Sequence, residues 1–145
     1  MKGLELVELM VAFQRRIMKR LGHHLAGEGL STSEGFVLWR LHKHGARRVS
    51  EIAASSGLPP STLTSLLDRL VEGGWVAREP DPDDRRAIIM QPTPKLEEFA
   101  RTSLRSVGKD LENSFRSLPS GLVDRLIADL GLVIGCFEEE ESQRK

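Results

Sequence analysis

Hydroxyl and guanidinium side chains gather in one stretch of this sequence, between positions 61 and 86. Four short hydroxyl residues stand within five positions: Ser61, Thr62, Thr64 and Ser65. Arg69 follows them, and residues 83–86 read Asp-Asp-Arg-Arg. Short hydroxyls both donate and accept hydrogen bonds, and arginine presents a fork of N–H donors that fits phosphate oxygens. This combination is suited to the base edges and phosphates of a nucleic-acid duplex.

The hydroxyl residues lie on a predicted helix over residues 61–72. Its apolar residues recur at the i, i+3, i+4, i+7 spacing of one helical stripe: Leu63, Leu66, Leu67 and Leu70. Residues 50–56 predict a shorter helix before it. Gly57 favours a left-handed exit from that helix, and Pro60 suits the first position of the next one. Two helices joined by so tight a turn predict a helix-turn-helix.

A β-hairpin is predicted directly after the second helix. Residues 75–78 and 87–90 have the composition of short strands, and the charged, proline-containing residues 79–86 form the turn between them. Pro92 cannot donate a hydrogen bond to a strand ladder, so we expect the second strand to end one or two residues before it. A helix-turn-helix followed by such a hairpin is a winged helix.

In this order and spacing, the motifs resemble those of the MarR family of bacterial transcriptional regulators. The matching pieces are Ser61-Thr62-Leu63-Thr64, Asp68-Arg69-Leu70, Gly74, Arg78 and Asp83-Asp84-Arg85-Arg86. The resemblance extends over nearly the whole chain, because the flanking helices also fall where that family has them. It implies a sequence-specific regulator of double-stranded DNA, more often a repressor, that binds a palindromic operator as a homodimer and is released by a small-molecule ligand.

Long amphipathic helices flank the winged helix on both sides. Apolar stripes predict helices over residues 4–25, 95–116 and 119–140. Ser31 and Glu34 have the spacing of a capping box, which starts a further helix running to about residue 44. The three terminal helices carry more apolar surface than the small winged-helix body can cover. We therefore predict an obligate homodimer, whose two recognition helices would match a palindromic site.

The predicted fold class is mostly α (α+β), with a winged helix-turn-helix over about residues 32–91. The long N- and C-terminal helices, about 4–26 and 94–140, form its dimerisation domain. A chain of 145 residues is one domain's worth, so residues 1–145 are expected to make a single MarR-like domain.

The resemblance also implies roles for the residues that contact DNA. In the family, an acid two residues before an arginine orients that arginine into the minor groove, which corresponds to Asp84 and Arg86 here. Arg85 would then contact phosphate or pair with Asp81 or Asp83. The full set expected to contact DNA is Ser61, Thr62, Thr64, Ser65, Arg69, Arg78, Arg85 and Arg86.

Two alternatives apply to the recognition helix. Thr64 and Asp68 could serve only to cap or brace the helix, without touching DNA. Ser65 stands where the family often has a longer basic residue, and a serine cannot reach a guanine with two hydrogen bonds as an arginine does. Specificity is then expected to depend more on the shape of the DNA.

By resemblance, a small aromatic or phenolic ligand is expected beside four residues: Phe13, Ile17, Phe36 and Trp39. The alternative is that these residues are ordinary apolar core. No metal or other cofactor is expected, because the histidines at 23, 24, 42 and 44 lack the i, i+4 spacing of a two-ligand helix face. Cys136 lies among apolar residues, where a thiol is usually inert, so thiol sensing is not expected.

Composition limits the classes of protein that fit. Basic and acidic residues balance at 21 each, and residues 40–90 carry eight basic and seven acidic side chains, a net charge of only +1. No apolar run is long enough to span a membrane, and the single cysteine suits a reducing, cytoplasmic location. Phosphate-binding loops and nucleophile motifs are absent, so no enzyme is expected. The rival to DNA binding is a winged helix that serves only as a protein–protein interaction module.

Overall fold

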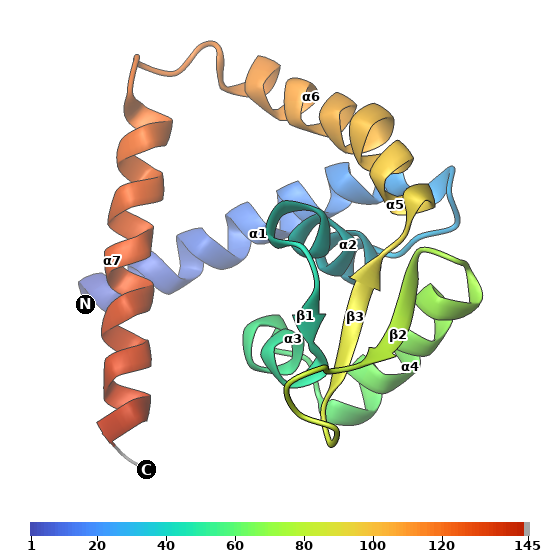
Figure 1. Ribbon diagram of the computed structural model, residues 1–145. Helices are drawn as coiled ribbons and strands as arrows, with labels where there is room; N and C mark the ends of the chain where they lie inside the picture. Colours follow the sequence, from blue (N-terminus) through green and yellow to red (C-terminus); the bar gives the residue numbers. More distant parts are fainter. Residues whose placement is uncertain (144–145) are drawn as a thin grey trace. The chain divides into compact units, whose positions relative to one another are not determined.

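The computed structural model describes residues 1–143, which form two compact units: Met1–Val107, and the part of the chain from Gly108 onward (Figure 1). The helices of the first unit are α1 (Lys2–Ala26), α2 (Thr32–His44), α3 (Val49–Ser56), α4 (Pro60–Glu72), α5 (Pro94–Phe99) and a π-helical segment η1 (Ala100–Leu104). The boundary between the units falls within α6 (Arg105–Phe115), and α7 (Leu122–Gln143) belongs to the second unit.

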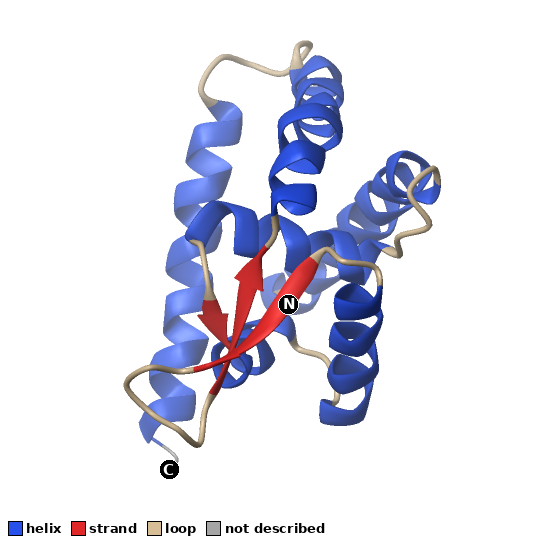
Figure 2. Cartoon of the chain, turned by 45° about the vertical axis from the view of Figure 1, so that its right-hand side comes forward, coloured by secondary structure: helices blue, strands red, loops and turns tan. Residues whose placement is uncertain are grey.

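A three-stranded antiparallel sheet completes the first unit. Its strands are β1 (Arg47–Arg48), β2 (Val76–Pro80) and β3 (Ile88–Pro92). β3 is the central strand, with β1 on one side and β2 on the other. Figure 2 shows the strands side by side, with the loop between β2 and β3 extending beyond their ends. The sequence predicted the hairpin but not β1.

Strand β3 runs through Pro92, so the prediction that it ends before this residue is wrong. Thr93 N–H donates to the carbonyl of Trp75, on the β2 side of the sheet. Because successive N–H groups of a strand point to opposite sides, the nitrogen of Pro92 faces the β1 side. There β1 pairs only with Met90 and Ile89, so nothing at Pro92 requires a donor.

The capping box predicted at the start of α2 is present. The hydroxyl of Ser31 accepts a hydrogen bond from the Glu34 amide at 3.2 Å, and the Ser31 amide donates to the Glu34 carboxylate at 2.8 Å. Gly45 ends the helix with φ = 75°, a conformation that residues with a side chain rarely adopt. Helix α2 therefore has the bounds that the sequence indicates.

The core of the first unit forms around the leucine stripe of α4. All four leucines of the stripe are buried, as are three apolar residues of α2: Val37, Leu38 and Leu41. Trp75 packs edge-to-face on Phe99, with ring centroids 5.1 Å apart. The predicted stripe is thus confirmed, and it fixes which face of α4 points away from the core.

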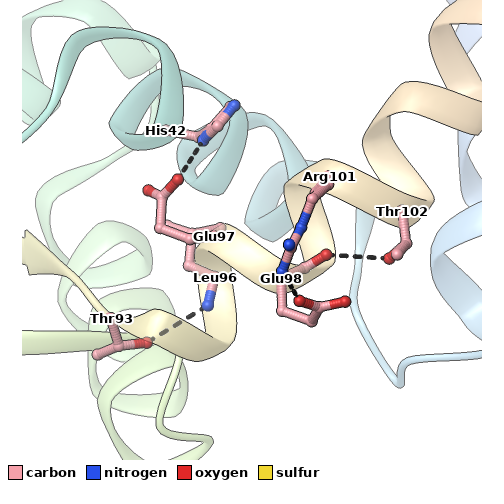
Figure 3. A network of polar contacts seen from close by, with 7 residues as sticks. All are labelled: His42, Thr93, Leu96, Glu97, Glu98, Arg101 and Thr102. Atoms are coloured by element: carbon pink, nitrogen blue, oxygen red, sulfur yellow. Dashed lines mark hydrogen bonds and ion pairs between the residues drawn. The ribbon is translucent and has the colours of Figure 1, made fainter.

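The helix predicted over residues 95–116 is continuous, but it contains the π-helical turn η1. The hydroxyl of Thr102 donates to the carbonyl of Glu98 at 3.0 Å (Figure 3). It also donates to the carbonyl of Phe99 at 3.4 Å. Thr64 and Ser65 make the same kind of hydrogen bond to the carbonyl four residues earlier in α4, which remains a regular α-helix, so this bond by itself does not widen the turn.

Helices α1 and α7 leave most of their apolar residues exposed. In α1 only Leu25 is buried, and the exposed large apolar residues are Leu4, Leu6, Val7, Leu9, Met10, Val11 and Phe13. In α7 no residue is buried, and the exposed set is Leu126, Ile127, Leu132, Ile134 and Phe137. Faces of this kind are typical of helices that pack against another chain.

Replacing the cap of α2 tests how much it stabilises the fold. We expect Ser31→Ala to lower the free energy of unfolding by about 1 kcal/mol, because the Glu34 amide loses its acceptor. Urea denaturation followed by circular dichroism measures the change. The control is Ser33→Ala, two residues farther along the chain, where the side chain is exposed. Its free energy of unfolding should stay within about 0.5 kcal/mol of wild type. Equal unfolding midpoints for the two variants would contradict the role of the cap.

Candidate nucleic-acid interface

The face of α4 opposite its leucine stripe is polar and exposed. Pro60 occupies the first helical position, as predicted, and the four hydroxyl residues at 61, 62, 64 and 65 are all exposed. The Thr64 hydroxyl donates to the carbonyl of Pro60 at 2.9 Å, and that of Ser65 donates to the carbonyl of Ser61 at 3.1 Å. The helix therefore uses the protons of Thr64 and Ser65, while their oxygen lone pairs still face solvent.

Arg69, near the end of α4, is held by a carboxylate from another helix. Its Nε donates to Oε1 of Glu34 at 2.7 Å, and Glu34 is only 5% exposed. Burial disfavours the charged carboxylate, but hydrogen bonds from Ser31 and Arg69 outweigh it and hold the pKa of Glu34 below its usual value. Arg69 thus has a structural partner 35 residues away, which no local sequence pattern indicates.

Arg78 connects the β2–β3 hairpin, which is the wing, to helix α4. Its guanidinium lies 2.6 Å from the carboxylate of Asp68, and both side chains are partly exposed. Asp68 therefore braces α4 against β2. This contact agrees with the alternative given above, in which Asp68 braces the helix without touching DNA. In this arrangement Arg78 can reach a phosphate only with the donors that Asp68 leaves free.

The base of the wing is organised by Asp81, which is 4% exposed. Its carboxylate pairs with Arg48 and accepts a hydrogen bond from the Asp83 amide at 2.8 Å. The hydrogen bond from Asp83 and the charge of Arg48 lower the pKa of Asp81, although its burial opposes the shift. Arg85 was expected to contact phosphate or to pair with Asp81 or Asp83. Neither pairing of Arg85 is observed among the described residues, and Arg48 pairs with Asp81 instead.

Asp84 acts on the backbone of the wing tip. Its carboxylate accepts a hydrogen bond from the Arg86 amide at 3.0 Å, and its carbonyl accepts from the Ala87 amide at 2.9 Å. These bonds close a tight turn of the kind that aspartate favours. Asp84 is therefore connected to Arg86 through the main chain, and the side chains of Arg85 and Arg86 are exposed at the tip.

The residues predicted to line a ligand pocket are partly exposed. The rings of Phe36 and Trp39 stack at 6.5 Å, with Arg40 over the first and Lys43 over the second. Phe36 lines a hollow between α2 and α3, whereas Trp39 lines a different one between α2 and the α5–η1 segment. Phe13 of α1 is exposed, so these aromatics are not fully buried core in this chain.

The hollow at Trp39 contains an ion pair. Nδ1 of His42 lies 3.0 Å from the carboxylate of Glu97, which joins α2 to α5 (Figure 3). Glu98 pairs with Arg101 on the neighbouring turn. The contact between His42 and Glu97 attaches the start of the long C-terminal helical segment to α2, whereas the pair of Glu98 and Arg101 lies within that segment.

Neither a metal nor a membrane is indicated by the described part of the chain. Residues 1–143 contain no group of three or more metal-binding side chains placed to hold an ion. None of the helices in this range has the combination of length and apolar character needed to cross a bilayer. Cys136 is exposed on α7, a helix in which no residue is buried.

Among known proteins, a family model matches only the winged helix of this chain, and an individual relative matches nearly the whole length of the chain. The model of the MarR family matches residues 30–88, from just before α2 to the start of β3. The HTH-type transcriptional repressor YetL of Bacillus subtilis (strain 168) is 29% identical over 143 residues, which cover 94% of this chain and 85% of YetL. Three further curated relatives, all described as HTH-type transcriptional regulators or repressors, align over 41%, 56% and 68% of their own lengths.

Solved structures share the fold. Wild-type MarR from E. coli, in its apo form, superposes with a TM-score of 0.73 at 25% identity, over 88% of this chain and 95% of that one. Reduced AbfR bound to DNA superposes with a TM-score of 0.70 at 21% identity, over 93% and 92% of the two chains. The predicted fold class, a mostly α winged helix with long terminal helices, is confirmed.

The ion pair of Asp81 with Arg48 at the base of the wing predicts how the stability of the protein depends on pH. A carboxylate whose pKa is lowered by folding stabilises the protein above its usual pKa of about 4, and this stabilisation is lost as the pH falls through the lowered value. We expect Asp81→Asn to melt at a lower temperature than wild type at pH 7, because Arg48 loses its charged partner. The difference should begin to narrow as the pH falls below about 4 and should disappear below the lowered pKa of Asp81, where the wild-type carboxylate is also neutral.

Thermal melts between pH 3 and pH 7 measure this effect. Asp83→Asn is the matched control, since its side chain is exposed and its amide still donates to Asp81. A difference between wild type and Asp81→Asn that stays constant over this pH range would show that the ion pair is not the cause.

Proposed function

We propose that the chain, whose residues 30–88 match the MarR family, is a transcriptional repressor of this family that binds a palindromic DNA operator as a homodimer. Proteins of this family are regulators and not enzymes, in agreement with the prediction from the sequence. The proposal rests above all on one observation: the exposed polar face of α4 is joined, through Arg78 and Asp68, to a wing whose tip exposes two arginines.

Each part of this surface suits one part of a DNA duplex. A helix fits the major groove, where the hydroxyls of Ser61, Thr62, Thr64 and Ser65 would meet base edges. The wing tip would place Arg86 in the minor groove and Arg85 on a phosphate, contacts that favour narrow, A·T-rich DNA over a unique base pair. The structure of reduced AbfR bound to DNA and the description of YetL as a transcriptional repressor support this proposal.

The dimer is supported by the exposed apolar faces of α1 and α7. Each helix exposes five or more large apolar residues along its length. Covering them with a second copy would stabilise the pair by removing this surface from water. A two-fold axis would then present two recognition helices to the two halves of one inverted repeat.

Release by a small aromatic ligand is the remaining part of the proposal. The stacked rings of Phe36 and Trp39, each with a cation above it, offer both an apolar surface and a positive charge to such a ligand. Both residues belong to α2, which also holds Arg69 of the recognition helix through Glu34. A ligand that favours another arrangement of α2 would therefore also affect DNA binding.

Selection from random duplex DNA tests the proposed function directly. The purified protein should enrich an inverted repeat whose half-sites lie about one helical turn apart. Recovery of a single, asymmetric half-site would contradict the dimeric mode of binding. Failure to retain any duplex at low ionic strength would contradict DNA binding itself.

Substitution at the wing tip tests the role assigned to Arg86. We expect Arg86→Ala to fold and dimerise normally but to bind the selected site about ten- to a hundredfold more weakly, because each subunit loses one charged contact. Fluorescence anisotropy at several salt concentrations measures Kd and its salt dependence. Arg116→Ala, an exposed arginine outside the winged helix, is the control and should bind as wild type does.

Substitution on α7 tests the dimer. Leu132 is 72% exposed in the single chain, so an aspartate there should not disturb the fold of an isolated subunit. If a second copy covers this face, Leu132→Asp buries a charge at the interface, and we expect mostly monomer at micromolar concentration. Light scattering coupled to size-exclusion chromatography reports the mass, with Arg125→Gln on the same helix as the control. A Leu132→Asp protein that remains fully dimeric would exclude this face from the interface.

A further inference from the structure

Glu34 divides its two carboxylate oxygens between two elements of the fold. Oε2 accepts the hydrogen bond from the Ser31 amide that starts α2, and Oε1 accepts the one from Nε of Arg69 in α4. Ser31 and Glu34 are three residues apart, whereas Arg69 is 35 residues farther along the chain. The capping box needs only the bond between Ser31 and Glu34. The bond between Arg69 and Glu34 is therefore not part of the cap and joins α4 to α2.

The second bond constrains a motion that apolar packing constrains less. The leucine stripe holds α4 against the core, but contacts between aliphatic side chains are non-directional and tolerate small rotations of a helix about its axis. A hydrogen bond from Nε at 2.7 Å to a carboxylate is directional and loses strength quickly when its geometry changes. Because Glu34 is buried at the first turn of α2, its oxygens are themselves held in place.

The same turn of α2 is also fitted closely to α1. A Cβ added at Gly35 would lie 2.4 Å from Cδ1 of Leu25, which is buried in the last turn of α1. The end of α1 therefore packs against the backbone of α2 beside the carboxylate that holds α4. Glu34 thus stands where three helices of the first unit meet.

We propose that Glu34 is a positioning residue for sequence recognition: through Arg69 it fixes the rotation of α4 about its own axis and so determines which hydroxyls face the base edges. This inference rests on the proposed function, because it needs a DNA sequence to be recognised. It assigns Arg69 a different role from the direct DNA contact expected from its position in the sequence.

The test compares binding to the selected operator with binding to a scrambled duplex of the same length. Glu34→Gln keeps the size of the side chain and an oxygen for the Ser31 amide, but it removes the charge that faces Arg69. We expect the ratio of operator to scrambled affinity to fall about tenfold, while binding to scrambled DNA and the salt dependence stay as in wild type. Ser31→Ala is the matched control: it weakens the cap but leaves the bond to Arg69, so it should keep the wild-type ratio.

Arg69→Ala separates positioning from phosphate contact, and its exposed side chain makes the substitution compatible with folding. If Glu34 positions α4 through Arg69, the ratio of operator affinity to scrambled-duplex affinity should fall in Arg69→Ala by the same factor as in Glu34→Gln. The double variant should show no further fall in this ratio, and the salt dependence of binding should be unchanged. A phosphate contact predicts weaker binding to both duplexes and a shallower salt dependence, with the ratio intact. That result, or a Glu34→Gln ratio within twofold of wild type, would overturn the positioning role while leaving the proposed function in place. A wild-type protein that does not discriminate between the duplexes would overturn both.

Discussion

One helix has to satisfy two opposed requirements, and the arrangement of the first unit follows from them. Helix α4 must bury its leucine stripe completely to hold the core together, and it must leave its opposite face polar and open. A helix can do both only if its orientation is fixed, since a rotation of one residue position, about 100°, would expose leucines and bury hydroxyls. The polar links from Glu34 and Asp68 serve this orientation rather than the core itself.

These links also use charges of both signs in a protein that has no net charge. In the winged-helix segment, the acidic residues Glu34, Asp68 and Asp81 each pair with an arginine. Pairing of this kind neutralises charges inside the unit or near its surface, and leaves the arginines of the wing tip exposed to solvent. A sum of charges over residues 40–90 therefore says little about the potential that a partner meets, because what matters is which cations remain on the outer face.

The elements that the sequence predicts well are those encoded by neighbouring residues. The capping box, the leucine stripe and the hairpin all depend on spacings of a few residues, and the structure has each of them. The ion pairs of Arg69 with Glu34 and of Arg48 with Asp81 join positions 35 and 33 residues apart, so no local pattern points to them. Strand β1 was missed for the same reason, since two arginines form a strand only because β3 lies beside them. The π-helical turn at Ala100–Leu104 is a local departure from regular helix geometry that the spacing of apolar residues does not record.

The anchoring of Asp81 has a consequence for the thermodynamics of association. Arg48 stands at the junction between β1 and α3, so its pair with Asp81 attaches the root of a long surface loop to the body of the protein. A loop that is already ordered loses less conformational entropy when it docks than one that must first become ordered. The protein meets this cost once, during folding, and each later encounter with a partner begins from a pre-organised wing.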